Sequence, residues 1–323
     1  MIHDSTLNST AESDTMSSML NLDQITEQLL EQQSRPLNQR LRTLKRLCPW
    51  LIPQLEADRG KNGPFPFWGR SLNVDEITGT IVVEPAVTQL LCQIVGIRHN
   101  PQLPNAGLQH TYGYLFSVID TPFGRKRERW TETLLETSLQ LPVSTFSPEP
   151  ATGTLLANAT WLAGSIAFHG DRRLSRLQQC LHRRVSQELC EKIWPWKCTW
   201  RLRETVCFTN SHQHLRQVEF RTDLCPLDQA PSSDDTNESD VSRFLLVYSI
   251  CDSQDTVPRL VTLFPVDQRF FDSLHSRGKQ RRATDIRPRY NAAVPGFPAE
   301  PQTGECQWIR TEWRSGTAVR SSN

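Results

Sequence analysis

The alternation of apolar and polar residues between positions 197 and 224 constrains the fold more than any other feature of this sequence. Apolar side chains occupy every second position from 198 to 208 except position 204, and the pattern resumes at 218–224 after a turn at 210–212. A period of two is typical of a strand with one buried face, and the short connection favours an antiparallel hairpin. Glu204 falls on the apolar parity, so we expect this carboxylate to be buried and to need a partner.

Further strands are predicted after the hairpin. Residues 244–250 are almost wholly apolar and predict a central strand that is covered on both faces. Residues 260–264 predict a fourth strand that ends at Pro265, and residues 306–313 predict an edge strand. Between these last two strands, Asp267 can cap a short helix.

Helical patterns dominate the part of the chain that precedes the hairpin. We expect helices over 20–56 (interrupted at Pro36), over 121–139, 154–168 and 172–193, and one that opens at Pro85, with short strands at 81–83 and 112–118. Helices followed by an antiparallel meander predict the α+β class. The expected architecture is a sheet of about four to six strands, mainly in residues 196–264, backed by helices and preceded by an N-terminal helical arm.

Composition divides the 323 residues into three parts. Residues 1–19 are polar, acidic and rich in Ser and Thr, which is typical of a disordered tail. Residues 20–59 are predicted to form an N-terminal helical segment, and residues 60–323 a single α+β domain. Within this domain, residues 226–241 are rich in Pro, Ser and Asp and predict a flexible acidic loop.

The distribution of charge points to an anionic partner. The formal net charge is only +1, but residues 1–34 and 228–240 together carry eleven acidic side chains and no Lys or Arg. The rest of the chain has 24 acidic side chains against all 36 basic ones, of which 30 are arginines. Arginine favours planar, bidentate contacts with phosphate or carboxylate groups. The alternative is that codon usage in a GC-rich genome produces the arginines and that water solvates them.

The first basic cluster lies between residues 120 and 130. Its cations stand in the first turn of a helix if that helix starts at 121, and in a solvated loop if the helix starts later. Cations in a first turn oppose the helix dipole, and a bound anion would remove this penalty. The candidate ligand-binding residues here are Arg125, Lys126 and Arg127.

The second cluster is the polar face of the predicted hairpin. Opposite charges on neighbouring strands pair without any function. If a helix covers this face, however, the charges line a pocket, and Arg221 with Glu219 or Asp223 becomes a candidate site. The charged residues of this face are Lys197, Arg201, Arg203, Glu219, Arg221 and Asp223.

The third and densest cluster is the segment 277–289, which has six cations and a single acid, Asp285. This segment is suited to clamp an anionic ligand, and it is equally suited to hold the acidic segment 228–240 of the same chain. The candidate ligand-binding residues are Arg281 and Arg282.

Missing patterns argue against several classes of protein. The sequence has no G-x-S-x-G, H-E-x-x-H, Walker A or G-x-G-x-x-G motif. Cys207, His212 and His214 offer three metal ligands but no fourth, so we expect neither a metal nor a cofactor. No apolar run approaches the ~18–20 residues that span a bilayer, so no membrane partner is expected. The nine widely spaced cysteines include no C-x-x-C pair, which favours a reducing cytoplasm.

Three functions agree with these patterns. The leading hypothesis is a protein that binds an anionic partner, either nucleic acid or a phosphorylated or carboxylated small molecule. The second is an enzyme for an anionic small substrate, in which Glu204, Glu219 or Asp223 transfers protons. The third is an assembly protein that uses the 20–56 helices through an exposed apolar stripe at residues 37, 41 and 44. The predicted anion-binding residues are Arg125, Lys126, Arg127, Arg201, Arg203, Arg221, Arg281 and Arg282, and the sequence does not indicate an oligomeric state.

Overall fold

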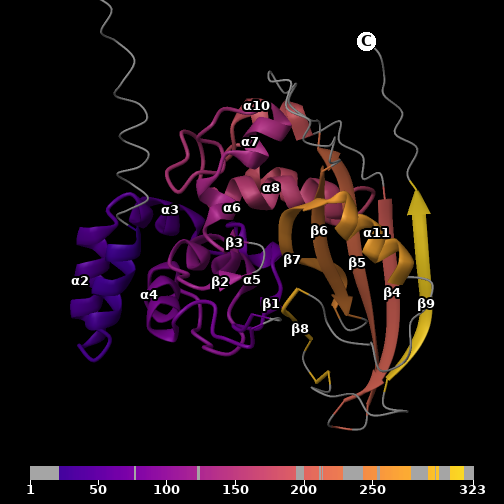
Figure 1. The fold of residues 1–323 in the computed structure, drawn as a ribbon, viewed down its shortest axis with the longest axis horizontal. Helices are drawn as coiled ribbons and strands as arrows, with labels where there is room; N and C mark the ends of the chain where they lie inside the picture. The colour runs from indigo at the N-terminus through magenta and orange to yellow at the C-terminus, as the bar shows by residue number, and fades with distance from the viewer. Residues whose placement is uncertain are drawn as a thin grey trace, which may run out of the picture.

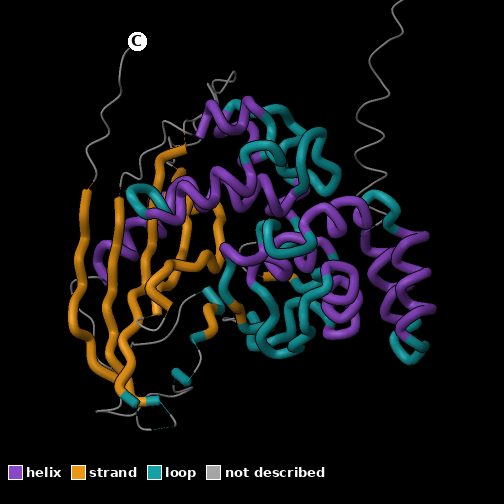
Figure 2. The backbone as a smooth tube through the Cα atoms, turned by 180° about the vertical axis from the view of Figure 1, so that it is seen from behind, coloured by secondary structure: helices purple, strands orange, loops and turns teal. Residues whose placement is uncertain are grey.

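The protein belongs to the α+β class, as predicted. A five-stranded antiparallel sheet has the strand order β7-β6-β5-β4-β9, and most helices lie to one side of it, next to β7 (Figure 1). Figure 2 shows the same division from the opposite side. The computed structural model describes residues 22–75, 78–121, 124–193, 200–210, 212, 214–227, 243–252, 255–277, 290–294, 296–297 and 306–315.

The elements follow one another with the helices first and the large sheet last. The sheet consists of β4 (Trp200–Thr209), β5 (Leu215–Leu227), β6 (Arg243–Asp252), β7 (Asp255–Asp267) and β9 (Cys306–Ser315). Two short ladders pair β1 (Arg70–Ser71) with β8 (Ala292–Ala293), and β2 (Asp120–Thr121) with β3 (Gly124–Arg125). The helices span 22–31, α2 (Leu37–Leu47), α3 (Leu51–Asp58), α4 (Pro85–Val95), α5 (Ala106–Leu108), α6 (Glu128–Thr131), α7 (Leu134–Leu139), α8 (Leu155–Ala167), α9 (Arg172–Leu181), α10 (Gln187–Ile193) and α11 (Gln268–Arg277).

The predicted hairpin is formed by β4 and β5. Trp200 lies opposite Leu224, and Thr209 lies opposite Leu215, so the pairing follows the alternation of the sequence. β6 pairs with the other side of β5. Its side chains enter the cores on both faces of the sheet, with Leu246 on one face and Leu245 on the other, which confirms a strand that is covered on both faces.

The two edges of the sheet are β7 and β9. The prediction that residues 306–313 form an edge strand is confirmed. The prediction that a strand ends at Pro265 is wrong, because β7 continues to Asp267. An edge strand is hydrogen-bonded to a neighbour on one side only. A proline, which has no N–H, can therefore be accommodated on the open side of such a strand without loss of a sheet hydrogen bond.

Each face of the sheet packs into its own apolar core. α8 packs across β5, β6 and β7 and closes the first core, which the helical part shares with residues such as Leu245 and Leu263. α11, residues 290–294 and Phe297 cover the opposite face and close the second core. The edge strand β7 therefore lies where the helical part, the sheet and α11 meet (Figure 1).

The N-terminal helices belong to the first core. Leu44 is fully buried, and Leu37 and Leu41 pack against the same core, so the apolar stripe of α2 faces the rest of the protein. The exposed stripe that an assembly protein would use is thus covered by the chain itself. The described helices also include none that is both long and apolar enough to cross a bilayer.

Three predicted elements differ in the structure. Residues 112–118 are not a strand, because α5 continues into a π-helix over Gln109–Gly113. Residues 106–117 are all buried, so the apolar alternation in this segment does not separate a buried face from an exposed one. The strand expected at 81–83 is reduced to a single bridge between Val74 and Ile81.

Two predicted helices are interrupted. Residues 121–139 form β2, β3, α6 and α7 instead of one helix, and Gly124 turns the chain between β2 and α6 with a φ of 84°. Residues 172–193 divide into α9 and α10. The expected helix at 154–168 is confirmed as α8, and the predicted cap Asp267 accepts a hydrogen bond from the backbone N–H of Phe270. The predicted tail at 1–19 and residues 228–241 of the predicted acidic loop lie outside the described residues.

Candidate functional site

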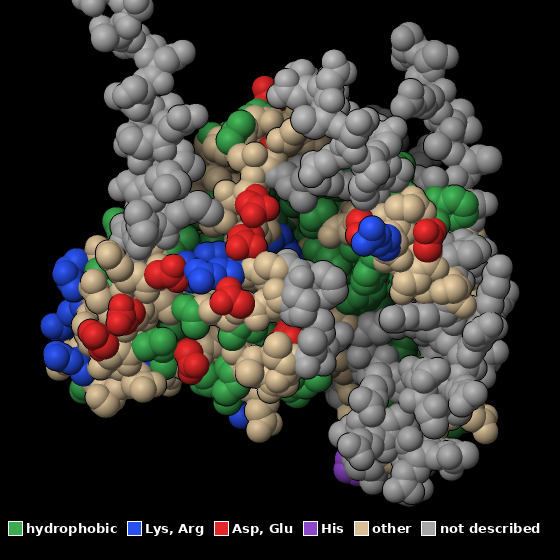
Figure 3. All heavy atoms as spheres, viewed as in Figure 1, with side chains coloured by type: hydrophobic (Ala, Val, Ile, Leu, Met, Phe, Trp, Pro, Cys, Tyr) green, Lys and Arg blue, Asp and Glu red, His purple; other side chains and the backbone are tan. Residues whose placement is uncertain are grey.

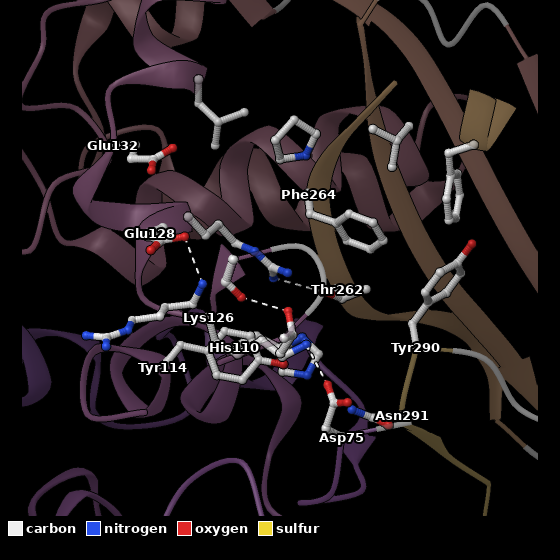
Figure 4. Close-up of a pocket in the computed structure, with 18 of the residues that line it drawn as sticks. Asp75, His110, Tyr114, Lys126, Glu128, Glu132, Thr262, Phe264, Tyr290 and Asn291 are labelled. Atoms are coloured by element: carbon white, nitrogen blue, oxygen red, sulfur yellow. Dashed lines mark hydrogen bonds and ion pairs between the residues drawn. The ribbon is translucent and has the colours of Figure 1, made fainter. Parts of the chain in front are cut away.

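A cavity of about 490 Å³ lies where the helical part meets the edge strand β7. His110 and Tyr114 line it from the helical side, and Phe264 and Tyr290 line it from the sheet side (Figure 4). A cavity of this size that combines apolar walls with a few polar groups is typical of a small-molecule site. We call it the aromatic cavity, and its wall also includes Asp75, Lys126, Glu128, Arg129, Glu132, Thr262, Asp267 and Phe270.

Arg129 of α6 distinguishes the electrostatics of this cavity. Its guanidinium carbon lies 5.3 Å from the centre of the Tyr114 ring and 5.2 Å from that of Phe264, and Nη1 donates a hydrogen bond to Thr262 Oγ1 at 3.2 Å. Burial lowers the pKa of Arg129, but a guanidinium keeps its charge in proteins. Within the described part of the chain, Arg129 has no carboxylate partner. Two ring faces and one hydroxyl compensate this half-buried cation only in part, which leaves it able to bind an anion.

His110 contributes a second polar group that lacks a partner. It is 2% exposed, its ring stacks on Tyr114 with 4.9 Å between ring centres, and Nε2 lies 3.0 Å from Ser71 Oγ. The other ring nitrogen, Nδ1, is buried and has no hydrogen-bond partner among the described residues. Burial lowers the pKa of His110 well below its usual range, and the charges of Arg129 and Lys126 lower it further. The imidazole is therefore neutral at physiological pH.

The backbone at the cavity departs from regular geometry on both sides. His110 stands in the π-helix, a conformation that is often found at functional sites, and its carbonyl accepts a hydrogen bond from Trp130 Nε1 at 2.6 Å. Tyr290 and Asn291 have φ angles of 53° and 60°, in the left-handed region that residues other than glycine rarely adopt. Such backbone strain is concentrated at ligand and active sites.

Hydrogen bonds between β1 and the segment after Tyr290 hold the two walls of the cavity together. Ser71, which contacts His110, lies opposite Ala292 in the β1–β8 ladder. The backbone N–H of Leu72 donates to the carbonyl of Asn291 at 2.6 Å. The position of the His110 ring is therefore coupled to the position of the strained 290–291 pair.

The three predicted cations of the first cluster are paired with carboxylates. Arg125 and Lys126 line the cavity, whereas Arg127 is buried outside its wall. Arg125 contacts Asp120 at 2.8 Å, Lys126 contacts Asp75 at 2.8 Å, and Arg127 contacts Asp23 at 2.6 Å. They precede α6, so the helix starts later, as in the alternative interpretation, but Arg127 is buried rather than solvated. Figure 3 shows basic and acidic side chains beside one another on this face of the helical part.

The hairpin cluster lies elsewhere, on the sheet face that α8 covers in part. Arg201 contacts Asp223 at 2.5 Å and also donates to the carbonyl of Ile166 in α8, and Arg221 contacts Glu219. Asp223 is fully buried, as expected if a helix covers this face. Burial and the neighbouring Arg221 lower the pKa of Arg203. These residues lie together, but outside the wall of the aromatic cavity.

Glu204, Arg281 and Arg282 are the remaining candidates. Glu204 is buried on the apolar parity of β4, as its position in the sequence indicated, and lies opposite Phe220. Arg281 and Arg282 lie outside the described residues. Among the described residues there is no group of three His, Cys, Asp or Glu side chains that is placed to hold a metal ion.

Sequence reasoning did not select the two residues that define the cavity. Arg129 belongs to the first basic cluster, but its spacing does not distinguish it from Arg127, because only the fold places it between two aromatic rings. His110 precedes the segment that was expected to be a strand. The π-helix that directs it into the cavity has no sequence signature of its own.

Comparison of the chain with known proteins gives no relative. No family model matches it, no curated protein matches it, and no solved structure matches it. The geometry of the aromatic cavity is therefore the basis for assigning a function.

Proposed function

We propose that the protein binds a small anionic molecule in the aromatic cavity. The ligand would present a phosphate or carboxylate group to Arg129 and an apolar, planar body to the aromatic walls. The observation that carries this proposal is the pairing of Arg129 with two ring faces and one hydroxyl, beside an open volume of about 490 Å³. An arriving anion would supply a counter-charge that no described carboxylate supplies to this half-buried guanidinium.

The neighbouring cations of the first cluster have less capacity for a ligand. Arg125, Lys126 and Arg127 already contact Asp120, Asp75 and Asp23, so an anion must compete with a carboxylate of the protein. The acids Glu128 and Glu132 also line the cavity and oppose a large negative charge. A ligand with one compact anionic group agrees with this arrangement better than a polyanion does, so nucleic acid has less support as the partner.

The aromatic wall indicates the shape of the rest of the ligand. Phe264 and Tyr290 lie with their ring centres 5.5 Å apart and their planes at 66°, and Phe270 lies 6.2 Å from Phe264. Rings in this arrangement present both faces and edges to the cavity, which suits a planar apolar group.

Phenyl phosphate is a minimal probe for this proposal, because it joins a phosphate to a planar ring. Isothermal titration calorimetry should show binding of phenyl phosphate, and Arg129→Gln should weaken it about 10- to 100-fold, the equivalent of about 1.5–3 kcal/mol for a hydrogen bond to a charged group. Arg125→Gln is the matched control, since it removes a rim cation that is already paired, and it should change the affinity less than about threefold. Equal losses in the two variants, or no binding to the wild type, would exclude Arg129 as the anion anchor.

An enzyme that acts on the same anionic ligand is the second candidate, because of His110. Its neutral imidazole can accept or donate a proton at Nδ1, next to the cation that would hold the substrate. The buried Ser71 contacts Nε2 but does not line the cavity, which fits a role in orienting the ring better than a role as nucleophile. A turnover that His110→Gln abolishes while binding of the substrate survives would favour the enzyme over the binding protein.

A further inference from the structure

A second cavity, of about 540 Å³, lies at the other end of β7. Its wall includes three arginines from three segments: Arg70 of β1, Arg98 in the loop that follows α4, and Arg259 of β7. We call it the basic cavity. The aromatic cavity is lined by residues 262 and 264–267 of β7 and the basic cavity by residues 257 and 259, so the two open on different stretches of the same strand.

The charged side chains that line the basic cavity are mostly positive, whereas those of the aromatic cavity include both signs. Among the described residues of its wall, Asp252 is the only acid, and this carboxylate already forms an ion pair with Arg216. Arg70 and Arg98 are exposed, and within the described ranges neither makes an ion pair. A concave site lined by charges of one sign focuses its field and attracts counter-ions.

The floor of the basic cavity is apolar. It is formed by large side chains from the helical part and from the sheet, namely Phe65, Trp68, Val218, Ile250, Val257 and Val294. Trp68 and Val218 are almost completely buried, so they form a fixed surface beneath the exposed arginines. Water has no polar partners on such a floor, and displacing it with an apolar group is favourable.

Backbone contacts fix the position of the arginine-bearing segments. Arg70 lies opposite Ala293 in the β1–β8 ladder and forms a bridge with Asn105 on its other side. The preceding Gly69 donates its N–H to the carbonyl of Leu260 at 2.8 Å, and this contact joins β1 to the strand that carries Arg259. Arg98 follows Gly96, whose left-handed φ of 71° ends α4. The backbone that carries these cations is thus fixed by hydrogen bonds, so binding of a ligand loses less conformational entropy.

We propose that the basic cavity binds a small amphiphilic anion. A phosphate or carboxylate head contacts the guanidinium groups of Arg70 and Arg98 at the mouth, and an aliphatic body lies on the floor formed around Trp68 and Ile250. This site is separate from the aromatic cavity and does not depend on the function proposed for it. Bidentate contact between guanidinium and phosphate or carboxylate supplies the specificity for the head group.

Octyl phosphate tests this proposal when it is used below the concentration at which it forms micelles. Calorimetric titration should show saturable binding, while methyl phosphate, which has the head alone, and octanol, which has the body alone, should each bind at least about tenfold more weakly. The double variant Arg70→Gln/Arg98→Gln should weaken octyl phosphate binding at least about tenfold. Arg42→Gln/Arg46→Gln, which removes the same charge from the exposed face of α2, is the matched control and should leave it unchanged.

Each other outcome would overturn the proposal in a recognisable way. Equal affinity for octyl phosphate and octanol would show an apolar surface without recognition of the head. Equal losses in the double variant and in the α2 control would show a response to net charge alone. Binding that survives Arg70→Gln/Arg98→Gln but disappears in Arg129→Gln would place the probe in the aromatic cavity. Because Arg70 and Arg98 are exposed, the double variant should keep the wild-type fold, which circular dichroism can verify.

Discussion

Asp58 is a buried carboxylate whose charge the fold compensates only in part. Its two oxygens accept hydrogen bonds from the hydroxyls of Tyr112 and Thr154, each at 2.7 Å. Burial nevertheless raises the pKa of Asp58 to about 6, against these two bonds and the charge of Arg184, which lower it. The folded protein therefore binds this proton more tightly than the unfolded chain does, and Asp58 favours folding most when it is protonated.

The free energy of unfolding should consequently contain a part that falls as the pH rises. This part is fully present below the usual aspartate pKa of 3.8 and is lost as the pH rises through about 6. The shift corresponds to about 3 kcal/mol, and Asp58→Asn should remove it. Urea unfolding at about pH 4 and about pH 7 provides the check, because the stability of the variant relative to the wild type should increase with pH. The exposed Glu149→Gln is the control, and a parallel pH dependence of Asp58→Asn and wild type would contradict the assignment.

The candidate site shows why single functional residues are hard to predict from a sequence. The basic character of residues 125–129 was visible, but the ion pair between Arg127 and Asp23 joins positions 104 residues apart. Arg129 differs from its neighbours through contacts with Tyr114, Thr262 and Phe264, and Thr262 lies 133 residues away in the chain. The sequence therefore predicted the charged segment but not which member has no carboxylate partner among the described residues.

At the level of the element, prediction succeeded where one face is apolar and fully buried and the other is polar and only partly covered. The β4–β5 hairpin has this property, and its alternation predicted both the strands and their antiparallel pairing. Residues 106–117 are buried on all sides, so the same alternation of aromatic residues there carried no information about strand or helix. The helix expected at 121–139 is interrupted by Gly124 and by the extended Glu132. The spacing of apolar residues does not predict either interruption.

The N-terminus of α8 links this helix to the buried Asp58. Thr154 Oγ1 accepts a hydrogen bond from the backbone N–H of Ala157 at 3.0 Å and donates one to Asp58. Thr154→Ala removes both interactions and should lower the free energy of unfolding by about 1–3 kcal/mol. Chemical denaturation measures the loss, and Thr154→Ser should restore most of it because the hydroxyl is kept. If serine and alanine destabilise equally, packing of the methyl group rather than the cap stabilises this end of α8.

At the level of the whole molecule, part of the positive charge is neutralised within the fold. Arg201, Arg216 and Arg127 each contact a carboxylate from a different segment of the chain. Other cations stay exposed, such as Arg42, Lys45 and Arg46 of α2. Figure 3 shows basic side chains at this end of the helical part. The excess of basic residues in the sequence therefore overstates the charge that is available to a partner, and the positions that remain available are decided by tertiary contacts.

The aromatic cavity joins the two halves of the molecule, so a ligand bound there should stabilise both. His110 and Arg129 belong to the helical part, whereas Thr262 and Phe264 belong to the sheet. Phenyl phosphate at about 100 times its Kd should raise the free energy of unfolding by about 2.7 kcal/mol, because it binds only when the two walls are together. Amide hydrogen exchange should then slow in α6 and in β7 alike, and Arg129→Gln should abolish the effect on both. Protection confined to one of the two elements would show that the probe binds a single wall and that the halves of the molecule open independently of it.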